Sequence, residues 1–192
     1  MARIIYIKDT KEKNLLLLGV SEEGENARYT VNRRLYSELG MPCVGAELDV
    51  GAMEEIIAYD ELYRAKKKAL SILAYADNNR RELRLKLLRA GFSRDASDCC
   101  VDEMVALGYI NEERTLERLI LLEAGKLRGP SRITAQLVSK GYSASLIRRV
   151  MNRLCESGEL DFTEIKKRLI ESRLDDDADD ECVKKLLYKQ GF

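Results

Sequence analysis

The sequence predicts a mainly α-helical fold, in which tandem three-helix repeats form an elongated, curved array after a small N-terminal antiparallel β unit. Three observations support this prediction. The 192 residues include only two prolines and are rich in Leu, Arg, Lys, Glu and Ala, which favours helices. Apolar residues recur with helical spacing from about residue 53 onward. A glycine followed by an aromatic residue returns every 50 residues, at Gly91-Phe92, Gly141-Tyr142 and Gly191-Phe192.

Residues 1–52 are expected to form the small β unit. Residues 3–9 and 14–20 are rich in apolar side chains and predict two strands joined by a charged turn. Residues 27–34 include β-branched and aromatic side chains in partial alternation, which predicts a third strand. Asp49 is a suitable N-cap for the helical structure that follows. The unit could cap the rest of the chain or bind a partner, and the sequence favours neither role.

Three repeats are expected after the β unit: repeat 1 at residues 53–110, repeat 2 at 111–158, and a truncated repeat 3 with two helices at 159–192. Gly108 and Gly158 are expected to end the third helices of the first two repeats. Polar residues precede most of the expected helices and are suited to cap them. These residues are Asn78 or Asn79, Ser93, Asn111, Ser143 and Asp161, and Pro130 lies in a first turn.

Apolar residues align when the repeats are superimposed with the 50-residue period. For example, Leu87, Leu137 and Leu187 share one position in the three second helices. The glycine after each second helix lets the chain adopt a left-handed conformation, and the aromatic residue that follows is expected to pack against the core of its own repeat. Because repeats of this size bury little surface alone, neighbouring repeats must stack.

The residue types that carry catalysis and metal binding are scarce. The chain has no histidine, which removes the usual general base and the commonest metal ligand. Its five cysteines form no C-x-x-C pair, and Cys100 aligns with the apolar Val150, so we expect reduced thiols in a cytoplasmic protein. The acidic run at 175–181 lacks the spacing of a calcium loop and is expected to cap the next helix. The apolar run at 15–18 is too short to span a membrane. We therefore expect no enzyme activity, no metal and no cofactor.

The net charge of zero hides a basic middle between two acidic ends. Residues 61–155 carry 19 basic and 11 acidic residues, a balance of +8, whereas residues 1–60 and 156–192 each have a balance of −4. A solvated helix face is the simpler explanation for any single basic cluster, but a strip over two repeats favours binding to a phosphate backbone or an acidic protein groove. The candidate partner-binding residues are Lys66, Lys67, Lys68, Arg80, Arg81, Arg84, Lys86, Arg89, Lys126, Arg128, Arg132, Lys140, Arg148, Arg149 and Arg153.

Three segments of the helical part resemble the RecX family, regulators of the RecA recombinase. They are ALSILAYADNNRRELRLKLLRAGF at 69–92, LGYINEER at 107–114 and KLRGPSRITAQLVSKGY at 126–142. The residues that fit the family's motifs are Gly108, Tyr109, Ile110, Asn111, Glu112, Lys126, Gly129, Arg132, Ile133, Leu137, Lys140 and Gly141. The resemblance covers residues 60–155 closely and 160–192 loosely.

The resemblance implies a curved helical array that lies in the groove of the RecA–DNA filament and modulates, usually inhibits, recombination, DNA repair and the SOS response. It implies no catalysis by this chain. We also expect a cytoplasmic monomer without a membrane anchor, and single- or double-stranded DNA is a second candidate ligand. Two departures stand out: Thr115 and Leu116 replace the family's usual aromatic and small residues, and relatives usually continue beyond the last Gly-Phe, here Gly191-Phe192. Partner affinity, or the docking of the C-terminal end, is therefore expected to differ from that of relatives.

Two other functions stay open. A helix-turn-helix DNA-binding regulator would present polar side chains on one exposed helix, and residues 144–156 offer Arg148, Arg149, Asn152 and Arg153. A protein-interaction scaffold of stacked helices would bind a different partner and no nucleic acid. The salt dependence and sequence specificity of DNA binding separate these possibilities.

Overall fold

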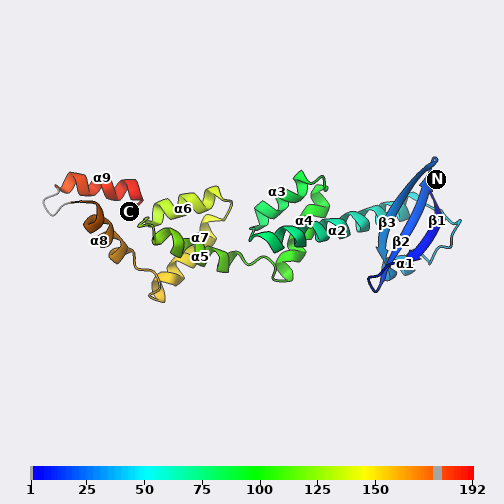
Figure 1. The fold of residues 1–192 in the computed structure, drawn as a ribbon, viewed down its shortest axis with the longest axis horizontal. Coiled ribbons are helices and arrows are strands. Elements are labelled where there is room, and N and C mark those ends of the chain that lie inside the picture. The colour runs from blue at the N-terminus through cyan, green and yellow to red at the C-terminus, as the bar shows by residue number, and fades with distance from the viewer. Residues whose placement is uncertain (1, 175–178) are drawn as a thin grey trace. The chain divides into compact units, whose positions relative to one another are not determined.

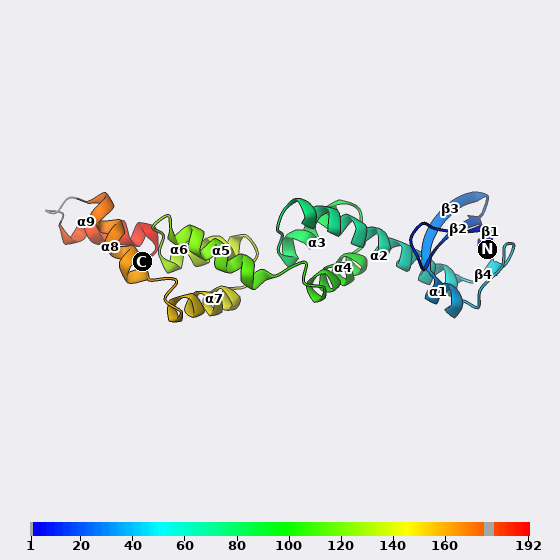
Figure 2. The same cartoon turned by 60° about the horizontal axis from the view of Figure 1, so that its bottom comes forward.

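The computed structural model describes residues 2–174 and 179–192 of the chain. It divides into two units. The first unit comprises Met1–Ala76 and Leu83–Ala106, and the second comprises Asp77–Glu82 and Leu107–Phe192. The strands and the first helices belong to the first unit, and the helices coloured from yellow-green to red belong to the second (Figures 1 and 2).

A four-stranded antiparallel sheet forms the start of the first unit. Its strands are β1 (Ala2–Asp9), β2 (Leu15–Glu22), β3 (Glu25–Asn32) and β4 (Glu47–Leu48), in the order β3-β2-β1-β4. The three predicted strands are confirmed, and the short β4 is an addition. The turn between β2 and β3 has two residues, Glu23 and Gly24, which both have positive φ, as the twist of a tight hairpin requires.

Two helices cover one face of this sheet. They are α1 (Arg33–Glu38) and α2 (Val50–Tyr75). Asp49 is the N-cap of α2, as predicted, and its side chain accepts a hydrogen bond from the Ala52 N–H. Alternate residues of the strands form a buried core with residues from both helices. The buried members of this core are Ala2, Ile4, Leu16, Leu18, Val20, Val31, Leu48, Met53 and Ile56.

A buried carboxylate fixes α2 against the edge of the sheet. Asp60 is 5% exposed, and its Oδ1 accepts a hydrogen bond of 2.8 Å from the backbone N–H of Thr30 in β3. Its Oδ2 pairs with Arg64 at 2.7 Å, one turn further along α2. The pairing compensates the cost of burying the charge.

Helices α3 (Arg80–Arg89) and α4 (Arg94–Ala106) follow α2. The side chains of Ala65 and Ala69 are fully buried on α2, and such small residues let α4 pack close to that helix. Ser93 caps α4 by accepting a hydrogen bond from the Ala96 N–H, as its position in the sequence predicts.

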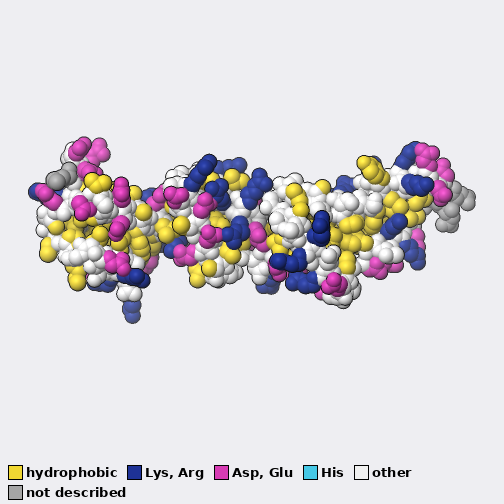
Figure 3. Space-filling view, turned by 180° about the vertical axis from the view of Figure 1, so that it is seen from behind, with side chains coloured by type: hydrophobic (Ala, Val, Ile, Leu, Met, Phe, Trp, Pro, Cys, Tyr) yellow, Lys and Arg dark blue, Asp and Glu magenta, His cyan; other side chains and the backbone are white. Residues whose placement is uncertain are grey.

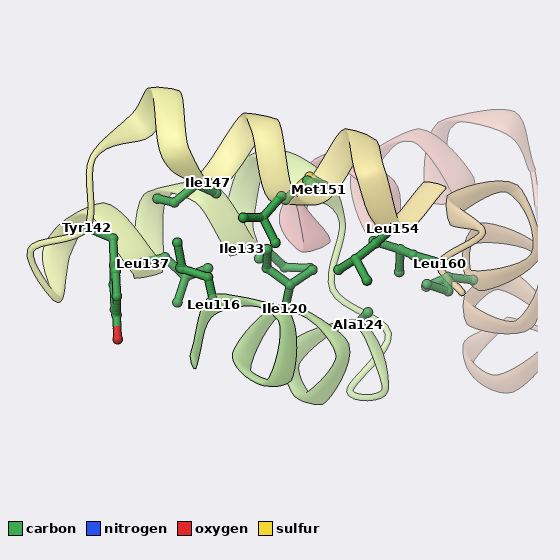
Figure 4. Close-up of a cluster of buried hydrophobic side chains, with 12 residues drawn as sticks. Leu116, Ile120, Ala124, Ile133, Leu137, Tyr142, Ile147, Met151, Leu154 and Leu160 are labelled. Carbon is green, nitrogen blue, oxygen red and sulfur yellow. The ribbon is translucent and has the colours of Figure 1, made fainter. Parts of the chain in front are cut away.

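The second unit has one main hydrophobic core, shared by α5 (Glu112–Ala124), α6 (Pro130–Ser139) and α7 (Ala144–Glu156). Apolar side chains from these three helices point toward one another, and several are fully buried (Figure 4). Helices α8 (Phe162–Arg173) and α9 (Asp180–Gln190) follow. Within the described residues, the mainly helical fold and the N-terminal antiparallel sheet are therefore as predicted.

The 50-residue period is a property of the backbone as well as of the sequence. Gly91, Gly141 and Gly191 have φ values of +92°, +100° and +88°, which side chains rarely tolerate. The N–H of the aromatic residue after each glycine donates to a carbonyl five residues earlier, and the N–H of the glycine donates to a carbonyl three residues earlier. This pair of bonds is the Schellman motif, and it closes α3, α6 and α9 in the same way.

The residue that follows each glycine packs in more than one way. Tyr142 is buried in the core of its own repeat, as expected. Phe192 contacts Phe162 of its own repeat, with ring centroids 6.3 Å apart at 79°, but it also packs against the core of α5, α6 and α7. The expectation that the aromatic packs only within its own repeat is therefore incomplete for the last copy.

The acidic run at 175–181 lies partly outside the described residues, since 175–178 are not among them. Asp179 is described, and its side chain caps α9 by accepting a hydrogen bond from the Cys182 N–H. In the described ranges no helix is both long and apolar enough to cross a membrane. The same residues hold no group of three metal-binding side chains.

Candidate partner-binding surface

Two helix ends that are distant in sequence meet in the second unit. The side-chain amide of Asn79, before α3, donates a 2.9 Å hydrogen bond to the backbone carbonyl of Lys140, at the end of α6. The side chain of Arg81 lies against Gly141, so closely that a Cβ there would be 2.7 Å from Arg81 Cδ. This contact, the first junction, brings Arg80, Arg81 and Lys140 together with all three side chains exposed.

Asn79 also starts α3. Its Oδ1 accepts a hydrogen bond from the Glu82 N–H, and the Glu82 carboxylate accepts one from the Asn79 N–H. This reciprocal arrangement is a capping box, with Asn79 rather than Asn78 as the cap. The Arg80 N–H donates to Glu112 at the start of α5. The backbone under the basic side chains of the first junction is therefore held by side-chain hydrogen bonds.

A second junction lies 50 residues further along, where the end of α9 meets the start of α6. The Gly129 N–H donates to the Gln190 carbonyl at 2.7 Å, and the Ser131 N–H donates to the Gly191 carbonyl at 3.1 Å. The Arg132 guanidinium donates to the Lys189 carbonyl and to the side chain of Gln190. Arg132, one of the candidate binding residues, thus has a structural role at this junction.

A buried glutamate engages two more of the candidate residues. Glu123 is 3% exposed and pairs with Lys126 at 2.8 Å and with Arg128. Burial alone would raise the pKa of Glu123, but the hydrogen bond from Lys126 and the charge of Arg128 outweigh it and hold the pKa below its ordinary value. Lys126 and Arg128 therefore neutralise a buried charge.

Helix α7 directs two of its arginines to acidic residues of α5. Arg149 pairs with Glu113, and Arg153 pairs with both Glu113 and Glu117. These pairs bridge two helices of one repeat at partly exposed positions. Arg148 on the same helix is exposed and has no hydrogen bond or ion pair to another described side chain.

Three candidate residues of the first unit also have acidic partners. Lys66 pairs with Glu103, and Arg84 pairs with Asp98 across from α3 to α4. Lys67 pairs with Glu12 at 2.9 Å and lies 4.8 Å from the centre of the Tyr63 ring. The hydrogen bonds with Tyr63 and Glu12 raise the pKa of Lys67. The side chains of Lys68, Lys86 and Arg89 are exposed.

The structure thus separates the fifteen candidate residues into two groups. Seven form ion pairs with Glu or Asp, Arg132 is bound at the second junction, and Arg80 and Lys86 also have interaction partners. Figure 3 shows Lys and Arg side chains interspersed with acidic ones on one face of each unit. The exposed residues without an ion pair to a described acidic residue are Lys68, Arg81, Arg89, Lys140 and Arg148.

Two basic residues that are not among the candidates, Arg114 and Arg118, line a hollow of about 400 Å³ in the second unit. Tyr109, Asn111 and Asp77 also line it, and Arg118 pairs with Asp77. Arg114 and Arg118 are four residues apart on α5, so the helical spacing of the two arginines was the available signal.

Comparison with known proteins gives one consistent result. The chain is 28% identical to the regulatory protein RecX of Xanthomonas axonopodis pv. citri (strain 306) over 131 residues, which cover 66% of this chain and 78% of the relative. It is 24% identical to the regulatory protein RecX of Caldanaerobacter subterraneus subsp. tengcongensis over 170 residues, 88% of this chain and 84% of the relative. The chain belongs to the RecX family. No family model matches it.

Solved RecX structures share the fold of this RecX-family chain. A crystal structure of a regulatory protein RecX superimposes with a TM-score of 0.69 at 18% identity, covering 100% of this chain and 95% of that one. The crystal structure of RecX from Lactobacillus salivarius gives a TM-score of 0.58 at 19% identity, over 69% and 89% of the two chains. The N-terminal sheet lies within the first of these superpositions, since that match covers the whole chain.

Proposed function

We propose that this RecX-family chain is a non-enzymatic regulator of homologous recombination that binds the filament of the RecA recombinase and inhibits its activity. The observation that carries the proposal is the family membership, because the relatives are regulatory proteins. The separation of the basic residues supports it. Five exposed cations, which form no ion pair with an acidic residue in the part of the chain that the structure describes, are available to a negatively charged surface.

The strength of single contacts limits how such a regulator works. An exposed ion pair contributes roughly 0–1 kcal/mol, so no single lysine or arginine of this chain would hold a partner. Several exposed cations that engage one filament at the same time would add their contributions without a separate association cost for each. The proposed effect is therefore mechanical, because a chain that occupies the filament obstructs its growth or the entry of a DNA strand.

The direct test uses the purified chain with the RecA recombinase of the same organism. We expect the rates of DNA-dependent ATP hydrolysis and strand exchange to fall at substoichiometric amounts of this chain. Unchanged rates with the chain in excess would refute the proposal. Accelerated rates would refute inhibition but would still agree with binding of the chain to the filament.

Charge reversal tests which residues carry the binding. Replacing Arg81, Lys86 and Arg89 with Glu is expected to abolish inhibition while circular dichroism shows unchanged helicity, because all three side chains are exposed. The matched control replaces three exposed cations of α8 and α9 with Glu and alters the net charge equally. The control residues are Lys166, Arg168 and Lys184. Equal loss of inhibition in both variants would mean that net charge alone matters.

The helix-turn-helix alternative has weaker support from the geometry. A reading helix must offer free polar side chains to base edges, but Arg149 and Arg153 of α7 are paired with acidic residues of α5. Arg148 and Asn152 are exposed. A mobility-shift assay with random and genomic duplexes tests the alternative, because a sequence reader should prefer its site by a factor of roughly 10³ or more.

A further inference from the structure

One face of the N-terminal sheet is not covered by α1 or α2. Leu16, Leu18 and Val20 belong to the core beneath these helices, so the alternate residues of β2, Leu17 and Gly19, face the other way. In the register of the sheet, Gly19 lies between Tyr6 of β1 and Arg28 of β3, and Leu17 lies between Lys8 and Thr30. We call this surface the open face.

A tyrosine ring lies across the glycine on the open face. A Cβ on Gly19 would meet three ring atoms of Tyr6 at less than 3.0 Å, a separation that real Cβ atoms do not show. The ring therefore occupies the space that a side chain at position 19 would fill. A register shift between Ile4 and Tyr6 displaces Ile5 and puts Tyr6 opposite Gly19. Tyr6 is half-buried, because one side of the ring rests on the strand backbone.

Cations flank this ring on the open face, whereas the acidic residues of the neighbouring hairpin do not. The Lys8 Nζ lies over the Tyr6 ring, 5.1 Å from its centre, and Arg28 is exposed on the far side of Gly19. Three acidic residues of the hairpin border a hollow with residues of the covered face. The acidic residues are Glu22, Glu23 and Glu25, and they line it with Val20, Ala27, Tyr29 and Met53.

The remaining charges near the open face largely cancel. Arg3 pairs with Glu47 of β4 at 2.7 Å, so these two contribute little to the net charge. Lys8 and Arg28 make the open face locally positive, although residues 1–60 as a whole have an excess of acidic side chains. The sign of the charge therefore differs between the two faces of the sheet.

We propose that the open face binds single-stranded nucleic acid, with one base stacked on the Tyr6 ring and the flanking phosphates bound by Lys8 and Arg28. An aromatic ring that lies flat on a sheet, with cations beside it, suits an unpaired base and its backbone. The bases of a duplex are stacked on one another and do not offer a face. The ammonium of Lys8 now lies over the ring, and an incoming base would displace it toward a phosphate.

A purely structural role for the ring is the competing explanation, because an aromatic side chain that covers a glycine also stabilises a sheet. That role needs the ring but neither of the cations. It also predicts no response of the ring to nucleic acid. The two explanations therefore differ in a local, measurable signal at position 6.

The chain contains no tryptophan, so Tyr6→Trp creates a single fluorescent reporter at the proposed stacking position. We expect an oligothymidylate of about 10 nucleotides to quench this fluorescence, and an oligouridylate arm shows whether RNA is accepted as well. A duplex of the same length is the control. Unchanged fluorescence, or equal quenching by the duplex, would overturn the proposal and leave the structural role of the ring.

Two further variants test the proposal with the natural tyrosine in place. Tyr6→Leu keeps an apolar cover over Gly19 but removes the aromatic face, so we expect it to bind the oligothymidylate roughly tenfold more weakly. Tyr6→Phe keeps the aromatic face, and we expect its affinity for the oligothymidylate to be unchanged. Lys8→Ala with Arg28→Ala should reduce the slope of log affinity against log salt by about 1.4, the contribution of two phosphate contacts on a single strand.

The control for the charge variant is Arg33→Ala with Arg34→Ala on α1, which packs against the opposite face. It removes the same charge and is expected to leave the slope unchanged. An equal loss of slope in both double variants would overturn the assignment to the open face. None of these measurements needs the recombinase, so their failure would leave the proposed regulation of the filament intact, and the reverse also holds.

Discussion

The second unit contains two junctions, and each joins the end of one helix to the start of another. The residues of the second junction lie 50 positions further along the chain than those of the first. At the first, the Asn79 side chain donates to the Lys140 carbonyl. At the second, position 129 holds a glycine, and its backbone N–H donates to the Gln190 carbonyl instead. A side chain therefore makes the contact in one copy, and the backbone makes it in the other.

The difference shows how a repeat can keep its geometry while its residues change. The first N–H groups of a helix lack intrahelical partners and need other acceptors. In α3, Asn79 and Glu82 supply them from the helix's own first turn. In α6, Gly129 offers no side-chain cap, and carbonyls at the end of α9 serve as acceptors. The second junction should therefore depend mainly on close backbone approach, with Arg132 adding side-chain hydrogen bonds, and the first on side chains.

The largest expected effect comes from the core that supports both junctions. Leu137 is fully buried on α6, whose start forms the second junction and whose end forms the first. Leu137→Ala should lower the free energy of unfolding by about 2–5 kcal/mol through a cavity. Chemical denaturation measures it, and a loss below about 1 kcal/mol would show that α6 does not support the two junctions through this core.

Glu123→Gln should weaken the start of α6, because Arg128 precedes Gly129 and would lose its charged partner. The expected cost at neutral pH is about 1.5–3 kcal/mol, the contribution of hydrogen bonds to a charged group. Since the folded pKa of Glu123 is lowered, its contribution is present above the ordinary value of 4.5 and is lost as the pH falls through the folded pKa. Urea unfolding at several pH values should show a smaller loss on acidification for the variant, and identical pH profiles would contradict this role.

Replacement of two of the periodic glycines separates backbone strain from docking. Gly191→Ala should lower the free energy of unfolding by about 1–3 kcal/mol because alanine is strained in the left-handed conformation. A further loss is expected because the added Cβ would be 2.5 Å from the backbone nitrogen of Arg132. Gly91→Ala is the matched control, because it has a similar φ but nothing within 4 Å of the added carbon. Thermal unfolding should show the larger loss for Gly191→Ala. Equal losses would mean that the second junction is not closely packed.

The smallest effect isolates the side-chain bond of the first junction. Asn79→Asp keeps the oxygen that caps α3 but removes the donor to the Lys140 carbonyl, and should cost about 0.5–1.5 kcal/mol. Asn111→Asp is the control. Among the described residues, the Asn111 side chain makes only the hydrogen bond in which its oxygen caps α5. The denaturation midpoints of the two variants are compared with that of the natural chain. A similar shift in both variants would mean that the hydrogen bond from Asn79 to Lys140 does not stabilise the fold.

The periodic features could be predicted because each depends on a local requirement of the backbone. A left-handed turn needs glycine, and a helix start needs a residue such as Ser143 or Asp161, so both leave a signal in the sequence. The two-residue β4 leaves none, because it is too short to show alternation. The burial of Glu123 was also not predicted, because a glutamate on a helix is usually solvated.

The candidate binding residues show the limit of the sequence more clearly. Arg148 and Arg149 are neighbours of the same type, but only Arg149 reaches an acidic partner on α5. Which basic residues are paired depends on the packing of elements that lie far apart in the chain, as for Lys67 and Glu12, which are 55 residues apart. The open face was hidden for a similar reason, since the register shift that brings Tyr6 over Gly19 has no pattern in the sequence.

Amide hydrogen exchange tests the central structural claim most directly, namely that the end of a second helix docks on the start of the second helix one repeat earlier. The N–H groups of Gly129 and Ser131 lie at a helix start, where intrahelical acceptors are absent and exchange is ordinarily fast. Their bonds to Gln190 and Gly191 predict protection of both amides in the natural chain and its loss in Gly191→Ala. Fast exchange of both amides in the natural chain would contradict the account.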